Sequence, residues 1–286
     1  MSESALDAKT DAEALSIALR LGADLLGGVA ADPMREAKLL LGLASGQGAH
    51  PLHHLTRADF STDLMDTYMA LLNRRVAREP MSHILGYRDF WTHRFKVTKD
   101  VLDPRPDTET LVAEALNTRF DKVLDLGTGS GCILISLLAE RPSTQGVGVD
   151  LSPAALDVAR ENANAIGVAQ RSTFLQGHWF APITTRFDLI VSNPPYIGAA
   201  AMPRLAPELS FEPRMALTDE ADGLDAYREI TQNAAEYLTA KGRLMVEIGF
   251  DQATQVRALF EAAKFQNVTV IQDINGRDRV VTGGLS

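Results

Sequence analysis

The chain has 286 residues, of which 45% are hydrophobic and 23% are charged. These proportions are ordinary for a globular protein, and no apolar run approaches the ~20 residues that a membrane span needs. The net charge is −9, and no long segment carries an excess of basic side chains. Tight, general binding to nucleic acid is therefore disfavoured, because such binding depends on a basic surface.

The first residues, MSESALDAKTDAEAL, are polar and acidic and lack the basic and apolar regions of a signal peptide. Cys132 is the single cysteine, so these 286 residues cannot form an intramolecular disulfide. Both features lead us to expect a cytoplasmic protein. The histidines do not share metal-ligand spacing with carboxylates or cysteines, so no metal site is predicted.

Residues 1–85 are predicted to form a small domain of helices only. Apolar residues recur at three-to-four spacing in AEALSIALRLGADLL, in PMREAKLLLGLASG and in TDLMDTYMALLNRRVARE. Pro33, directly after Asp32, marks the start of the second helix.

Residues 86–110 are predicted to form a structured connector. The stretch YRDFWTHRFKV is rich in aromatic and β-branched residues, which favours a short β-hairpin. The stretch DPRPDTETLV follows, and it predicts a helix start at Asp107 with Thr108 and Glu109 in the first turn.

Residues 111–286 form the third predicted part, in which helices and strands alternate. Such alternation predicts a mainly parallel sheet covered by helices on both faces, a Rossmann-like α/β fold. The last two strands have no helix between them, so we expect them to pair antiparallel as a hairpin at one edge. The expected helices are 107–119, 131–140, 152–166, 224–239 and 251–264, and the expected strands are 122–126, 146–150, 171–175, 187–192, 242–248, 268–273 and 278–282.

The stretch KVLDLGTGSGCILISLL runs from a buried strand through Gly127-Thr128-Gly129-Ser130-Gly131 into a helix. Ligands of open α/β sheets bind outside the carboxyl ends of strands, and glycines let the backbone approach a ligand closely. The spacing G-x-G-x-G lacks the pyrophosphate fingerprint G-x-G-x-x-G, which tells against NAD. The alternative is a tight strand-to-helix turn without a ligand.

The next strand, GVGVD, ends on Asp150. A carboxylate at this position can accept hydrogen bonds from both hydroxyls of a ribose. The alternative role is to cap the following helix, but Ser152 and Pro153 already mark that start. We therefore predict that Asp150 binds a ribose.

The stretch FDLIVSNPPYIG begins as an apolar strand and breaks into Asn193-Pro194-Pro195-Tyr196. Two consecutive prolines cannot continue a sheet ladder, because neither has an N–H to donate. The segment is either a surface turn that ends the strand or a clamp that holds a substrate at the strand's carboxyl end.

Together, DLGTGSG, the acid-ended strand and NPPY after the fourth strand resemble the class I S-adenosylmethionine-dependent methyltransferases. The resemblance implies that Gly127–Gly131 run past the methionine part of S-adenosylmethionine and that Asp150 holds its ribose. The third strand ends in LQGHWF, which implies that Trp179 is an apolar wall beside the adenine; the alternative is core packing. His178 stands where many relatives have an aspartate that contacts the adenine amino group.

In related enzymes the Asn/Asp-Pro-Pro-aromatic motif marks methylation of a planar nitrogen, either an amide or an exocyclic base amine. The resemblance implies that Asn193 offers its side-chain carbonyl and also borders the cofactor. Pro194 offers its backbone carbonyl, held still by the ring of Pro195, and Tyr196 supplies a flat face.

The flanking sequence separates the possible substrates. REPMSHILGYRDFWTHRFKVTKDVLDPRPDTETLV closely resembles the connector of the protein-(glutamine-N5) methyltransferases that act on peptide chain release factors, with departures at His83 and Asp103. The stretches ELSFEPRMAL, ADGLDAYREI, GRLMVEIGFDQ and DINGRDRVV match as well. The implied substrate is the glutamine of the Gly-Gly-Gln loop of class I release factors, which the helical domain would dock. Arg105 and Glu109 are implied near the cofactor mouth, although Arg105 equally suits a surface ion pair.

Two other functions stay open. A nucleic-acid methyltransferase acting on adenine N6 or guanine N2 requires a basic cleft, which the charge count does not suggest. A silent adaptor that only binds the cofactor has no need of the intact tetrad from Asn193 to Tyr196. We expect a monomer without a membrane partner and without stable binding to nucleic acid.

Overall fold

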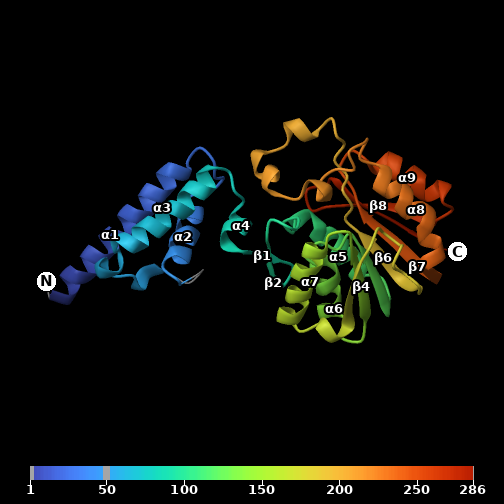
Figure 1. Cartoon of the computed structure of the whole chain (residues 1–286), viewed down its shortest axis with the longest axis horizontal. Helices are drawn as coiled ribbons and strands as arrows, with labels where there is room; N and C mark the ends of the chain where they lie inside the picture. Colours follow the sequence, from blue (N-terminus) through green and yellow to red (C-terminus); the bar gives the residue numbers. More distant parts are fainter. Residues whose placement is uncertain (1–2, 48–51, 286) are drawn as a thin grey trace. The chain divides into compact units, whose positions relative to one another are not determined.

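The computed structural model describes residues 3–47 and 52–285, and the chain divides into two compact units, residues 1–86 and 87–286 (Figure 1). Each unit has a hydrophobic core of its own. Within the described residues, no helix is both long enough and apolar enough to cross a bilayer.

The first unit is helical, as predicted. Its core contains Leu40 and Leu41 from one helix and Tyr68 and Leu72 from another, all fully buried. The short last helix was not predicted, because five residues cannot display a helical period. The helices are α1 (Glu3–Leu26), α2 (Pro33–Ala44), α3 (Thr62–Val76) and α4 (Met81–Leu85).

The predicted hairpin is present at the start of the second unit. Strands β1 (Tyr87–Phe90) and β2 (His93–Lys96) pair antiparallel. The side chain of Asn162 fixes the hairpin to the rest of the unit, because its Oδ1 accepts from the Lys96 amide at 2.7 Å and its Nδ2 donates to the Lys96 carbonyl at 3.1 Å.

The described part of the second unit contains a seven-stranded sheet with the order β5-β4-β3-β6-β7-β9-β8. The first five strands in this order are parallel, and β9 lies antiparallel between β7 and β8. The mainly parallel sheet and its antiparallel hairpin are therefore confirmed. The strands are β3 (Lys122–Leu126), β4 (Gln145–Asp150), β5 (Ser172–Gln176), β6 (Phe187–Ser192), β7 (Leu238–Glu247), β8 (Gln266–Gln272) and β9 (Asp278–Gly284).

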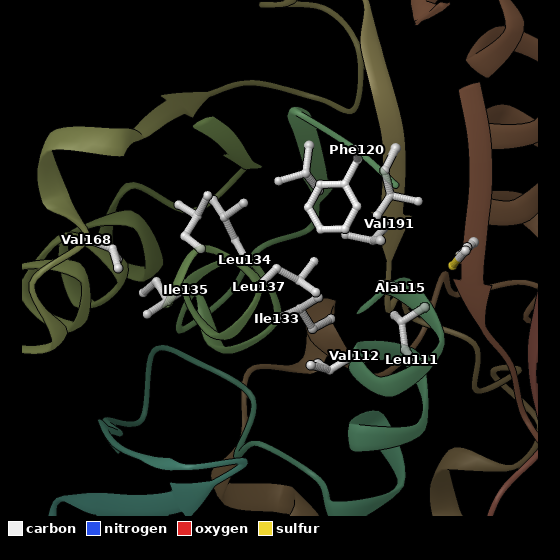
Figure 2. Close-up of a cluster of buried hydrophobic side chains, with 14 of the residues drawn as sticks. Leu111, Val112, Ala115, Phe120, Ile133, Leu134, Ile135, Leu137, Val168 and Val191 are labelled. Carbon is white, nitrogen blue, oxygen red and sulfur yellow. The ribbon is translucent and has the colours of Figure 1, made fainter. Parts of the chain in front are cut away.

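Helices cover both faces of the sheet. Because successive residues of a strand point to opposite sides, each central strand contributes to both buried clusters. In β3, Val123 joins the cluster formed with α5 and α6, and Leu124 joins the cluster formed with α8 and α9. Figure 2 shows the first cluster, where Leu137 of α6 lies near Phe120 and Val191. The helices are α5 (Glu109–Leu116), α6 (Cys132–Glu140), α7 (Pro153–Ile166), α8 (Asp225–Tyr237) and α9 (Ala253–Ala262).

Candidate active site

A cavity of about 590 Å³ opens at the carboxyl edge of the sheet. The ends of β3, β4, β5 and β6 contribute to its lining, as expected for an open α/β fold. Further walls come from the connector segment 100–102, from residues 151–155 and from the segment 213–229. The strand ends singled out in the sequence therefore meet in one place.

The glycine loop after β3 depends on left-handed backbone conformations. Gly127, Gly129 and Gly131 have φ angles of 70°, 55° and 79°, which other residues adopt only with strain. Gly127 and Gly129 line the cavity. A Cβ on Gly131 would lie 2.6 Å from the Cδ1 of Ile135, so this glycine serves helix packing.

Thr128 and Ser130 support the loop from behind. Both are buried, and neither lines the cavity. The Thr128 hydroxyl donates to Asp125 Oδ2 at 2.7 Å, and the Ser130 carbonyl accepts from Asn162 Nδ2 at 2.9 Å. These two residues hold the backbone that a cofactor would meet.

Asp150 stands at the end of β4 and lines the cavity. Its Oδ2 accepts from the Gly129 amide at 2.8 Å, and its Oδ1 accepts from the Ser152 amide at 2.9 Å. Burial raises the pKa of Asp150, and these backbone hydrogen bonds oppose that rise. The hydroxyl of Ser152 caps α7 by accepting from the Ala155 amide, so Asp150 is free of the capping role that was its alternative.

Trp179 and His178 border the cavity beyond β5. Trp179 has a φ of 44°, and its Cζ3 lies 3.6 Å from where a Cβ on Gly127 would stand. Trp179 also packs against the buried cluster of α8 and α9, so the core packing considered as its alternative role is present. His178 Nδ1 lies 3.2 Å from Glu229 Oε1, which gives this histidine a carboxylate neighbour.

Asn193 follows β6 and lines the cavity. The hydroxyl of Ser192 donates to the Leu126 carbonyl at 2.7 Å, which ties the end of β6 to the end of β3. Asn193 Nδ2 donates to Thr108 Oγ1 at 3.2 Å. Its Oδ1 is buried and receives no hydrogen bond from the described residues. A buried acceptor without a donor is costly, and it indicates a place for a ligand donor.

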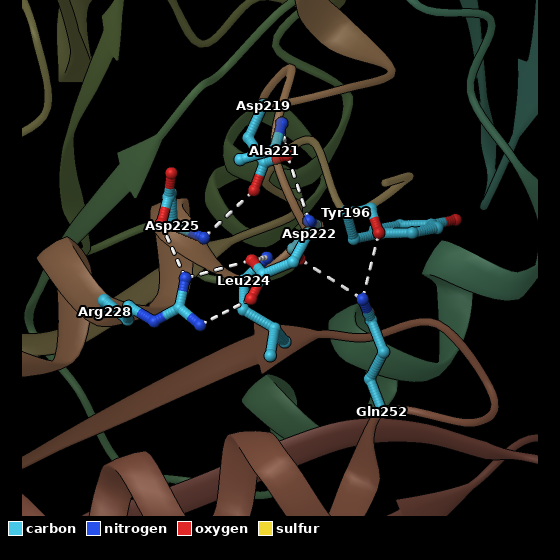
Figure 3. Close-up of polar contacts among 9 residues, drawn as sticks. Tyr196, Asp219, Ala221, Asp222, Leu224, Asp225, Arg228 and Gln252 are labelled. Atoms are coloured by element: carbon cyan, nitrogen blue, oxygen red, sulfur yellow. Dashed lines mark hydrogen bonds and ion pairs between the residues drawn. The ribbon is translucent and has the colours of Figure 1, made fainter. Parts of the chain in front are cut away.

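Pro194, Pro195 and Tyr196 complete the tetrad, and a hydrogen bond to the backbone of Tyr196 holds its end in place. Pro194 is buried, and Pro195 lines the cavity. Gln252 Nε2 donates to the Tyr196 carbonyl at 2.9 Å and to the Gly223 carbonyl at 3.2 Å (Figure 3). Burial raises the pKa of Tyr196 to about 12, so its hydroxyl stays protonated at neutral pH.

The loop beside the tetrad is organised by carboxylates, as Figure 3 shows. Asp219 accepts from the backbone amides of Ala221, Gly223 and Asp225 at 2.9–3.0 Å. Among the described residues, the carboxylates of Asp219, Asp222 and Asp225 lie within 4.8 Å of one another. Arg228 pairs with Asp222 at 2.6 Å and with Asp225 at 2.5 Å, so a guanidinium already offsets part of the negative charge of this cluster.

Arg105 and Glu109 do not line the cavity. Arg105 Nη2 pairs with Glu212 Oε1 at 2.5 Å, and the Glu212 carboxylate is buried. Glu109 Oε1 accepts from the Trp91 amide at 2.8 Å and so fixes the turn of the hairpin. Arg105 therefore forms an ion pair, but with a buried carboxylate 107 residues away in the chain and not with a partner at the surface.

Two fully buried carboxylates, Asp125 and Glu247, have no role in the predicted site. Asp125 and Glu247 have no exposed surface, and burial raises the pKa of each to about 7. Asp125 supports Thr128 in the glycine loop. Glu247 ends β7, beside the end of β6. Both acids lie at the carboxyl end of a strand whose preceding residues are largely apolar. That position is the signal in the sequence that could have identified them.

Comparison with known proteins agrees with this geometry. The methyltransferase from Pyrococcus furiosus shares the fold, with a TM-score of 0.54 at 12% identity over 75% of this chain and 95% of that one. Residues 98–219 match the methyltransferase small domain, and residues 18–86 match the PrmC N-terminal domain. The release factor glutamine methyltransferase of Agrobacterium fabrum (strain C58) is 38% identical over 285 residues, which cover 96% of this chain and 97% of the relative.

The chain belongs to the release factor glutamine methyltransferase family. The family member of Cereibacter sphaeroides is 52% identical over 219 residues, which cover 76% of this chain and 79% of the relative. The resemblance drawn from the connector and the NPPY motif is therefore confirmed, as is the methyltransferase fold. The chain is a methyltransferase, and membership of this family implies use of S-adenosylmethionine.

Proposed function

We propose that this enzyme transfers a methyl group from S-adenosylmethionine to the side-chain amide nitrogen (N5) of the glutamine in the Gly-Gly-Gln loop of class I peptide chain release factors. The observation that carries the proposal is Asn193. Its Nδ2 is anchored on Thr108, and its buried Oδ1 lacks a donor. An amide N–H of the substrate is the donor that this oxygen needs.

The cavity suits S-adenosylmethionine. Gly127 and Gly129 expose backbone where a side chain would fill the space, and Asp150 keeps lone pairs for ribose hydroxyls beyond its two backbone contacts. Trp179 offers an apolar wall beside Gly127. When bound, this cofactor supplies an electrophilic methyl group on a sulfonium sulfur.

The residues of the tetrad would act by orientation. An amide nitrogen is a poor nucleophile because its lone pair is delocalised into the carbonyl. Acceptance of both N–H bonds, by Asn193 Oδ1 and the Pro194 carbonyl, would fix the nitrogen for in-line attack. Tyr196 would pack against the planar amide. Its pKa of about 12 rules out a phenolate base at neutral pH.

Charge favours a polypeptide over a nucleic acid. The net charge is −9, and acidic side chains outnumber basic ones around the cavity, where Arg214 is already paired with Glu220 at 2.5 Å. Phosphate groups would meet repulsion there. The acidic residues that line the cavity are Asp100, Asp150, Asp219, Glu220, Asp225 and Glu229.

Purified enzyme, S-adenosylmethionine labelled in its methyl group and a release factor test the proposal. The matched control is the same factor with its loop glutamine changed to alanine. We expect label in the first factor and none in the second. Equal labelling of both factors, or label that enters only DNA or RNA, would contradict the proposal and favour another acceptor.

A further inference from the structure

Two segments that line the cavity lie far apart in the chain. Residues 100–102 belong to the connector, and we call them the connector wall. Residues 213–216 lie between the tetrad and α8, and we call them the loop wall. Neither wall is part of a strand, so the hydrogen bonds of the sheet do not fix the separation between them.

Each wall has an anchor of its own. Val101 of the connector wall packs in a buried cluster with Ala155 and Val158 of α7, the helix that follows β4. The loop wall is followed by Leu217, whose carbonyl accepts from the Ile197 amide at 3.0 Å, next to the tetrad. One wall is thus fixed near the end of β4, and the other is fixed near the end of β6.

The side chain of Glu212 connects the two walls. Glu212 stands directly before the loop wall, and only 1% of its side chain is exposed. Its Oε1 pairs with Arg105 Nη2 at 2.5 Å, and its Oε2 accepts from the Asp103 amide at 3.4 Å. Asp103 and Arg105 follow the connector wall in the chain. One buried carboxylate therefore joins the flank of each wall to the flank of the other.

The burial of Glu212 makes this ion pair different from one at the surface. Burial raises the pKa of Glu212, and Arg105 opposes that rise. A second buried carboxyl, Asp103, lies beside it, and Arg88 Nη1 is 3.8 Å from Asp103 Oδ2. An ionised carboxylate that loses its counter-charge in a protein interior is costly. Without Arg105, the Glu212 carboxylate would draw in water or a proton, and the walls would lose the contact that joins them.

We propose that Arg105 and Glu212 are positioning residues that hold the connector wall against the loop wall and so keep S-adenosylmethionine in the cavity. Neither residue lines the cavity, so both act through the segments beside them. Loss of the pair should let the walls separate and speed cofactor dissociation, while the glycine loop and Asp150 stay in place. The inference rests on the proposed function, because it takes this cavity as the site of S-adenosylmethionine.

The dissociation rate constant (koff) of methyl-labelled S-adenosylmethionine, chased with an excess of unlabelled cofactor, tests this inference. Glu212→Gln keeps the shape of the side chain and removes its charge. We expect koff to rise about tenfold, because a hydrogen bond between charged groups is lost. The association rate constant should change little, since variants of one site differ mostly in dissociation. Arg105→Lys should give an intermediate koff, because an ammonium keeps the charge and loses the planar fork.

Glu161→Gln is the matched control. Lys96 of β2 pairs with Glu161 of α7 at 2.5 Å, so this ion pair also holds the connector but does not join the two walls. Its loss should leave koff at the wild-type value.

Single-turnover methylation at saturating cofactor separates positioning of the cofactor from damage to the tetrad. The rate should change little in Glu212→Gln, because Gln252 still holds the Tyr196 carbonyl. The loss should appear in the KM for S-adenosylmethionine. A single-turnover rate that falls as far as the cofactor affinity would place the defect at the tetrad and overturn the inference.

A double-mutant cycle tests whether the two side chains act as one unit. Adding Arg105→Gln to Glu212→Gln should cause no further rise in koff. The Arg105 side chain is 33% exposed, so Arg105→Gln alone is the milder test if Glu212→Gln does not fold. Wild-type koff in a folded Glu212→Gln or Arg105→Gln enzyme, an equal rise in Glu161→Gln, or rises that multiply in the double variant would overturn the inference while the proposed function stands. A wild-type enzyme that does not bind S-adenosylmethionine overturns the proposed function and this inference with it.

Discussion

Asn193 is the central residue of the proposed mechanism, because the two polar ends of its side chain have different environments. The nitrogen is bonded to Thr108 Oγ1, and the oxygen is buried without a donor. Amide orientation follows from such networks, and here the network leaves one acceptor unsatisfied. The acceptor lies at the carboxyl edge of the sheet, where the ligands of this fold bind.

Replacing Asn193 with alanine should therefore abolish most turnover. Loss of one oriented hydrogen-bond group at a reacting centre lowers kcat by roughly 10²–10³-fold. Affinity for S-adenosylmethionine should fall only modestly, because the glycine loop, Asp150 and Trp179 stay in place. Single-turnover methylation and cofactor titration measure the two effects. The exposed Asn233→Ala is the control, and normal turnover in Asn193→Ala would remove Asn193 from the reaction.

Because the carboxyl of Asp125 is buried, we expect the stability of the protein to depend on pH. Burial raises its pKa from 3.8 to about 7. A group whose pKa is raised in the folded state contributes stability below its unfolded pKa, and that stability is lost as the pH rises through the folded pKa. As the pH rises from 5 to 8, the free energy of unfolding of the wild type should thus fall by on the order of 3 kcal/mol relative to that of Asp125→Asn. Denaturant unfolding at both pH values measures this, and a constant difference would contradict the assignment.

Among the elements of the site, the segment between Tyr196 and α8 is the part for which the sequence predicts no helix or strand. Segment 217–225 runs beside residues 196–199, where the Ile197 amide donates to the Leu217 carbonyl at 3.0 Å. The Ala199 amide likewise donates to the Ala221 carbonyl at 2.9 Å. Gln252 bridges the two segments from the start of α9. The stability of this loop therefore supports the position of the tetrad.

Gly223→Ala should disturb that support. Gly223 has a φ of 82°, and a Cβ there would lie 2.4 Å from the Tyr196 carbonyl oxygen. Gly167 is the matched control, with a φ of 84° and open space around the added atom. Gly167→Ala should lose about 1–2 kcal/mol of stability and keep its turnover. Gly223→Ala should lose more stability and most turnover. Equal behaviour of the two variants would show that the loop does not support the tetrad.

The sequence predicts the central elements well and the long-range contacts poorly. Strands 122–126 and 187–192 have the predicted bounds, because apolar runs end at glycines or prolines. Strand β7 begins at Leu238, four residues before the predicted start. The sequence does not reveal this because the first residues of the strand are partly polar. The contact between Thr108 and Asn193 spans 85 residues, and no local pattern encodes it.

For the whole molecule, we propose that one unit carries out catalysis and the other binds the protein substrate. Residues 87–286 contain the cavity and every residue of the candidate site. Residues 1–86 form a separate helical unit with its own core. We propose that this helical unit docks the release factor, with residues 86–110 as the connector.

A chain of residues 87–286 alone tests this division. Its core is independent of the helical unit, so it should fold and bind S-adenosylmethionine with nearly unchanged affinity. The KM for a release factor should rise strongly, whereas methylation of a short Gly-Gly-Gln peptide should change little. Isothermal titration and steady-state kinetics measure these quantities, and an unchanged KM for the release factor would remove the docking role.

We propose that this site methylates a glutamine amide in a release factor. Tandem mass spectrometry of a release factor incubated with the enzyme and S-adenosylmethionine tests it most directly, because fragment ions place the methyl group on one residue. We expect one methyl group, on the N5 nitrogen of the Gly-Gly-Gln glutamine, and none with Asn193→Ala. A methyl group on another residue, or an unmodified factor after incubation with wild-type enzyme, would contradict it.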